Sequence, residues 1–145
     1  MPLTTKLLVL AIAAQVLLSV AILLLMGRER VPRVMSGEVH WQDIAVDRSA
    51  YPLRARLLSN SFDNQFQLPV LFYVAALLAL WSGSIGWIDV LLAWLFVALR
   101  YVHAAIHTTS NSLLPRFSAY TAGMVVLIVL WLWLVVRLVI LAPSV

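Results

Sequence analysis

Cysteine is absent from this chain of 145 residues, and charged residues make up only 11% of it. Without cysteine the chain has neither a disulfide framework nor a thiolate metal site, so any reactive thiol must come from a ligand. The scarcity of charge excludes an ordinary soluble domain, in which about 25% of residues are charged. Hydrophobic residues instead make up 63% of the sequence, which is typical of a membrane protein.

Long apolar stretches account for most of this hydrophobicity. Residues 7–26 and 117–136 each form a run of 20 apolar or nearly apolar residues, the length that crosses a hydrocarbon core of about 30 Å as a helix. A third stretch begins at Trp87 and continues as a helix through His107. The apolar part of the second stretch, 68–81, is too short to span. The polar residues before it must therefore also lie at membrane depth, with their side chains facing protein.

The sequence therefore predicts a single-domain, all-α membrane protein, a four-helix transmembrane bundle with up-down topology. The domain is expected over residues 1–145, with spans at about 7–26, 53–81, 87–107 and 116–140. The expected loop at 27–51 is long for a connection within a helix bundle. Such a length is typical of a loop that covers a binding site as a lid. Pro52 suits the first position of the second helix, and Pro69 should kink that helix about one turn earlier.

Basic residues are distributed unevenly about these spans. Only Lys6 and Arg137 fall on the side of the termini, whereas eight arginines lie in or beside the first and third loops, namely Arg28, Arg30, Arg33, Arg48, Arg54, Arg56, Arg100 and Arg116. The positive-inside rule then predicts that both of these loops are cytoplasmic and both termini are not, as in a bacterial inner-membrane protein. This topology, rather than nucleic-acid binding, explains the net charge of +4 and the pI of about 10.1.

Polar side chains gather at the predicted cytoplasmic ends of three helices. The second helix carries Arg56, Asn60, Asp63 and Gln67 at helical spacing, the third carries Arg100, His103 and His107, and Arg116 opens the fourth. Ionisable groups in a membrane segment cost about 3 kcal/mol each on insertion scales, so they usually mark a functional cavity. Guanidinium groups bind carboxylates, and the helix N-terminus at Arg116 favours an anion such as a thiolate. The pattern predicts a site for a small anionic or zwitterionic molecule.

Simpler interpretations of the same residues remain open. The arginines suit membrane anchoring, with their side chains reaching to lipid phosphates. Asn60, Asp63 and Gln67 suit hydrogen bonds between helices. His103 and His107 are four residues apart, but no nearby carboxylate or cysteine completes a ligand set, so no metal site is predicted.

The order of these polar residues is that of a known family. Arg-x3-Asn-x2-acid on the second helix, Arg-x2-His-x3-His on the third and an arginine opening the fourth resemble the MAPEG family. These are membrane-associated proteins in eicosanoid and glutathione metabolism. The string NQFQLPVLFY at 64–73 also resembles bacterial members. The resemblance covers nearly the whole chain. It implies a homotrimer that binds glutathione as co-substrate between neighbouring subunits and acts on a lipophilic molecule from the bilayer.

The resemblance also implies roles for individual residues. Arg116 would be the catalytic residue that stabilises the glutathione thiolate. The remaining residues would bind glutathione or shape its pocket: Arg56, Asn60, Asp63, Gln67, Arg100, His103, His107 and, from an adjacent subunit, Arg30 or Arg28. An alternative register gives Asn64 and Gln67 the roles of Asn60 and Asp63. Three residues depart from the family pattern: Asp63 replaces a glutamate, His107 a tyrosine, and Phe117 a serine found in some members.

Three functions follow as hypotheses. The first is an integral membrane glutathione transferase or peroxidase-type enzyme that activates a thiolate against lipophilic electrophiles. The alternative is a structural or accessory membrane subunit that keeps the fold without the chemistry. A third is a binding protein for an anionic lipid or a lipophilic signal.

Overall fold

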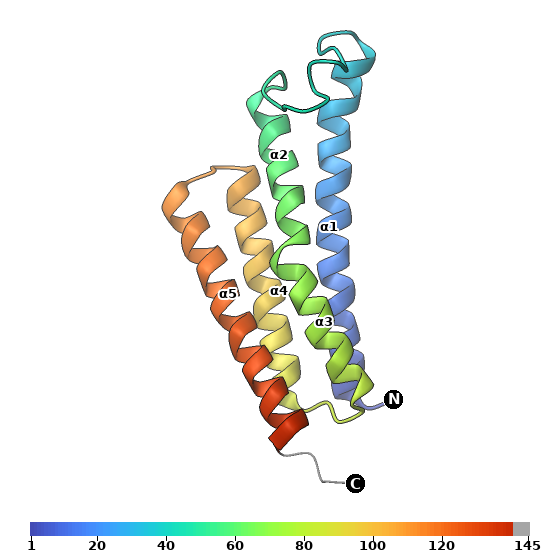
Figure 1. Cartoon of the computed structure of the whole chain (residues 1–145), viewed down its shortest axis with the longest axis vertical. Helices are drawn as coiled ribbons and strands as arrows, with labels where there is room; N and C mark the ends of the chain where they lie inside the picture. The colour runs from blue at the N-terminus through green and yellow to red at the C-terminus, as the bar shows by residue number, and fades with distance from the viewer. Residues whose placement is uncertain (141–145) are drawn as a thin grey trace.

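The computed structural model describes residues 1–140 as an antiparallel bundle of four long helices (Figure 1). The first is α1 (Leu3–Met35), and the second is built from α2 (Leu53–Asp63), the 3-10 turn η1 (Asn64–Phe66) and α3 (Leu68–Trp81). The third is α4 (Trp87–Thr108), and the fourth is α5 (Leu113–Val135), extended by the π-helical turn η2 (Val136–Ile140). Residues 141–145 of the predicted domain lie outside the described part of the chain.

The four-helix, up-down fold predicted from the sequence is confirmed. Each of the four helices is long and apolar enough to cross a membrane, and residues 1–140 contain no strand. The N-terminus and the end of η2 lie at one end of the bundle (Figure 1). The α1–α2 loop and the α4–α5 turn lie at the other end, which we call the loop end.

Helix α1 is longer than its apolar run. A loop was expected from Gly27, but this is wrong, because the helix continues to Met35. Its polar end is stabilised by an ion pair between Arg33 and Glu29, one turn apart, at 2.9 Å, and Arg54 of α2 contacts the same Glu29 at 3.0 Å. A helix of 33 residues is about 50 Å long, so its last turns extend beyond a hydrocarbon core of about 30 Å.

Small and aromatic residues form the core between the helices. Phe72 of α3 stacks on Phe96 of α4 with ring centroids 4.9 Å apart. Four buried alanines surround the pair: Ala75, Ala76, Ala79 and Ala93. Small side chains let helix backbones approach closely, which is how helices associate in lipid. Large apolar residues cover much of the outer surface, as a lipid-facing surface requires.

The second helix breaks where Pro69 predicts a kink. Pro69 lacks a backbone N–H, so the carbonyl of Gln65 loses its helical donor, and Gln67 adopts a non-helical conformation (φ −100°, ψ −104°). The buried Gln15 of α1 donates a hydrogen bond from Nε2 to Oε1 of Gln65 at 3.1 Å. Gln65 in turn donates to the carbonyl of Ser61. A polar contact inside the bundle therefore holds α1 against the break.

A buried ion pair joins α4 to η2 at the end of the bundle opposite the loop end. Oδ2 of Asp89, at the start of α4, lies 2.7 Å from Nη1 of Arg137 in η2 and also accepts the backbone N–H of Gly86 at 2.8 Å. Arg137 donates further hydrogen bonds to the carbonyl of Ser84 and the hydroxyl of Ser82. One carboxylate thus caps α4 and joins it to the end of the fourth helix.

Candidate functional site

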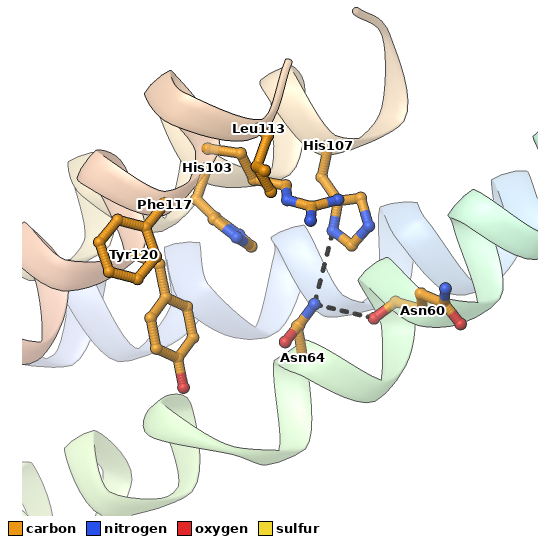
Figure 2. Close-up of a pocket in the computed structure, with 8 residues that line it drawn as sticks. Asn60, Asn64, His103, His107, Leu113, Phe117 and Tyr120 are labelled. Carbon is orange, nitrogen blue, oxygen red and sulfur yellow. Dashed lines mark hydrogen bonds between the residues drawn. The ribbon is translucent and has the colours of Figure 1, made fainter. Parts of the chain in front are cut away.

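A polar pocket of about 350 Å³ lies near the loop end, between the second helix and the α4–α5 pair. This volume falls within the range of small-molecule sites. Its lining residues come from three of the four helices: Asn60, Asn64, His103, His107, Leu113, Arg116, Phe117 and Tyr120. Figure 2 shows Asn64 of the second helix reaching toward His107 of α4 across this space. Four of the residues predicted from the sequence therefore share one pocket: Asn60, His103, His107 and Arg116.

Asn64 connects the two sides of the pocket (Figure 2). Its Nδ2 donates to the carbonyl of Asn60 at 3.0 Å and lies 3.4 Å from Nδ1 of His107. This contact joins the second helix to α4 across the pocket.

The two histidines and Tyr120 form an aromatic cluster along one wall. His103 lies 5.6 Å, centroid to centroid, from both His107 and Tyr120. His103 is buried, and its Nδ1 has no hydrogen-bond partner within residues 1–140. Across these residues no three side chains of His, Cys, Asp or Glu are grouped as a metal site requires. The cluster offers ring edges and imidazole donors to an organic ligand.

Arg116 supplies the positive charge of the pocket. It lies in the first turn of α5, whose N-terminus carries partial positive charge. Its Nη1 donates to Oδ1 of Asn111 at 2.5 Å. Within residues 1–140 no carboxylate lies within ion-pair distance of Arg116. The guanidinium and the helix end together favour an anion here.

Arg100 lies behind the pocket. Its side chain is 1% exposed, and its Nη2 donates to the carbonyl of Asn64 at 3.0 Å. This carbonyl lies in the 3-10 turn that breaks the second helix. The guanidinium stands 5.9 Å from the ring centroid of Tyr120. Nε and Nη1 of Arg100 have no partner in the described chain. Arg100 thus supports Asn64 and adds positive charge beneath the site.

Asp63 and Arg56 lie outside the pocket. The carboxylate of Asp63 pairs with Arg48 of the first loop at 2.5 Å, and both side chains are largely exposed. Arg48 is presented by a turn in which Asp47 accepts hydrogen bonds from the hydroxyl and backbone N–H of Ser49. These bonds lower the pKa of the Asp47 carboxyl. Arg56 is exposed on α2. The first loop therefore reaches the second helix through Asp63.

Gln67 and Arg30 also stand apart from the pocket. Gln67 follows the helix break, and its Oε1 accepts a hydrogen bond from the hydroxyl of Tyr120 at 3.4 Å. Arg30 stacks over the ring of Tyr51, 4.6 Å from its centroid. Arg30 lines a separate apolar groove of about 420 Å³ beside α1. The break therefore separates Gln67 from Arg56, Asn60 and Asp63, although their helical spacing predicted one continuous face.

An apolar groove of about 460 Å³ runs between α3 and α5. Leu68 and Leu71 line one side, while Met124 and Trp131 are among the residues lining the other. Met124 lies one helical turn after Tyr120, and Leu68 directly follows Gln67, the hydrogen-bond partner of Tyr120. The Tyr120–Gln67 contact therefore separates the polar pocket from an apolar surface.

Sequence reasoning missed Leu113, Phe117 and Tyr120, and kept Asn64 only as an alternative. Tyr120 follows Arg116 by four residues on one helix, so the two side chains lie on the same face. That spacing could have identified Tyr120. Asn64 lines the pocket in place of the predicted Asp63, which pairs with Arg48 of the first loop instead.

No curated protein and no solved structure matches the sequence. The MAPEG family model matches residues 8–136, which include parts of all four helices and every residue of the pocket. The chain is therefore an integral, multi-pass membrane protein that belongs to the MAPEG family.

Proposed function

We propose that this protein is a membrane enzyme that binds glutathione and activates its thiol against a lipophilic electrophile. The observation that carries the proposal is Arg116, a guanidinium with no carboxylate partner in the described chain, lining a pocket at the start of α5. Membership of a family known for glutathione-related activity supports the choice of thiol.

The pocket's donors suit the charges of glutathione, which has two carboxylates, one ammonium group and one thiol. Asn60, Asn64 and the imidazole of His107 provide hydrogen-bonding groups for the peptide. Arg116 is the only cation among the lining residues of this pocket. Two carboxylates and a thiolate call for more than one cation, so a single chain offers too little positive charge.

A homotrimer would supply the missing charge. In this part of the proposal, the exposed Arg56 and Asp63 face a neighbouring copy, and that copy contributes the guanidinium of its own Arg30. The loop end is cytoplasmic, in agreement with the eight arginines around the first and third loops. Glutathione would then enter from the cytoplasm of a bacterial inner membrane.

The reaction requires ionisation of the thiol and attack by the resulting thiolate. The S–H proton passes to solvent water, and Arg116 with the helix N-terminus stabilises the sulfur anion. The thiolate attacks an electrophilic carbon, forming a C–S bond while the displaced group leaves with the bonding electrons. With a lipid hydroperoxide, the thiolate attacks the distal oxygen instead, so that the O–O bond breaks, the lipid alkoxide leaves and is protonated to the alcohol, and glutathione sulfenic acid forms. The thiol of a second glutathione then attacks the sulfur of the sulfenic acid, which gives glutathione disulfide and water. The apolar groove between α3 and α5 offers a route from the bilayer for either substrate, the lipophilic electrophile or the lipid hydroperoxide.

The test compares Arg116→Ala with Arg54→Ala, an exposed arginine at the same end of the bundle. Calorimetry gives the glutathione Kd, and turnover is measured with a lipophilic aryl halide and with a lipid hydroperoxide. Loss of one preorganised electrostatic group typically lowers kcat by about 10²–10³-fold. We expect this loss in Arg116→Ala with a smaller change in Kd, and unchanged kinetics in Arg54→Ala. No binding and no turnover in the wild-type protein would favour an accessory subunit instead.

A further inference from the structure

The turn between α4 and α5 contains one residue in a left-handed conformation. Helix α4 ends at Thr108, and Asn111 has φ +49°, the one positive φ of a non-glycine residue within residues 1–140. Its backbone N–H donates to the carbonyl of Ile106 at 2.7 Å. Asparagine tolerates this conformation better than most residues, because its short side chain hydrogen-bonds locally. Helix α5 begins two residues later, at Leu113.

The side chain of Asn111 contacts the cation of the pocket. Its Oδ1 accepts a hydrogen bond from Nη1 of Arg116 at 2.5 Å. The left-handed backbone therefore determines where the carboxamide lies, and the carboxamide determines where the guanidinium lies. Because an amide is neutral, it orients the guanidinium without cancelling its charge. An acidic residue in the same place would hold the arginine equally well but compete with any anion in the pocket.

We propose that Asn111 is a positioning residue, which holds the guanidinium of Arg116 at the pocket while leaving its positive charge available to the thiolate. This inference rests on the proposed function, since it concerns the ionisation of the same bound thiol. Asn111 acts through Arg116 and does not line the pocket itself.

Two substitutions separate the backbone role of Asn111 from the role of its side chain. Asn111→Gly preserves the left-handed turn, because glycine adopts positive φ without strain, but it removes the acceptor. Asn111→Asp keeps an acceptor of the same shape and adds a negative charge beside Arg116. The matched control is Ser112→Ala in the same turn, because the Ser112 side chain makes no cap hydrogen bond to α5.

The experiment records the ultraviolet difference spectrum of the glutathione thiolate as a function of pH, for the purified wild-type protein and the three variants. Circular dichroism, the thermal midpoint and kcat/KM with a lipophilic aryl halide are measured in parallel. We expect Asn111→Gly to lower kcat/KM about tenfold, as for loss of one hydrogen bond to a charged group. Asn111→Asp should lower it about 100-fold, as for loss of an electrostatic stabiliser. The thiolate profile should move to higher pH, furthest in Asn111→Asp, while Ser112→Ala matches the wild type.

Two results would overturn the inference without touching the proposed function. One is a wild-type thiolate signal with profiles unchanged in both Asn111 variants. The other is an equal displacement of the profile in Asn111→Gly, Asn111→Asp and Ser112→Ala, which would show that any change in the turn has the same effect. Should one Asn111 variant fail to fold, the pH profile of the other decides. Absence of a thiolate signal in the wild-type protein would instead refute the proposed function, and this inference with it.

Discussion

Replacing Asp89 by asparagine should destabilise the bundle while leaving the pocket intact. The Asp89 side chain is 1% exposed and that of Arg137 is 13% exposed, with 2.7 Å between the charged atoms. Removing one partner of a buried ion pair costs about 3–5 kcal/mol, because the other charge stays buried without compensation. Asparagine still caps α4 through Gly86, and Arg137 keeps its bonds to Ser84 and Ser82. We therefore expect the lower part of that range, about 3 kcal/mol.

The assay is reversible unfolding in mixed micelles, completed as a double-mutant cycle with Arg137→Met. The two side chains share one hydrogen-bonded contact, so their effects should not add. A coupling energy of about 2 kcal/mol is expected, within the range for contacting residues. The affinity for glutathione should stay within about twofold of wild type, because residues this distant couple weakly. A cost below about 0.5 kcal/mol, as for a surface substitution, or strictly additive effects, would refute the reasoning.

The remaining predictions concern the second helix and the residues behind it. Arg100→Met should leave unfolding within about 1 kcal/mol of wild type, because removing a desolvated charge offsets the lost hydrogen bond. It should still weaken glutathione binding by releasing Asn64, and a loss of more than about 3 kcal/mol in stability would contradict this. Asn64→Leu should raise the glutathione Kd about tenfold, whereas Asp63→Asn should change it less than about threefold, since a hydrogen bond is worth about 1 kcal/mol or more. A larger change in the calorimetric Kd for Asp63→Asn than for Asn64→Leu would contradict this and would indicate that Asp63 contacts glutathione.

The number and order of the helices could be predicted because the bilayer demands long apolar runs. The break in the second helix was also predictable, since Pro69 cannot donate the hydrogen bond that a continuous helix needs. The end of α1 was not, because a helix that has left the membrane no longer has to be apolar. There the Glu29–Arg33 pair, rather than hydropathy, continues the helix.

Within the site, spacing along a helix was informative and contacts between distant segments were not. His103 and His107 are four residues apart and line one wall, as their spacing predicts. Asp63 shares the same periodicity as Asn60, yet it pairs with Arg48, because the loop that brings Arg48 back is folded by tertiary contacts. Arg100 likewise bonds a carbonyl 36 residues earlier in the chain. No sequence pattern indicates that Arg100 reaches this carbonyl.

The most direct test of the central claim is a pH titration of the glutathione thiolate bound to the wild-type protein, followed in the ultraviolet beside Arg116→Ala. A free thiol of this kind has a pKa of about 8.5. With Arg116 present, the bound thiol should be largely ionised at neutral pH, and the Arg116→Ala protein should return it toward the solution value. Glutathione that binds with full heat but titrates in both proteins as it does in water would contradict the account.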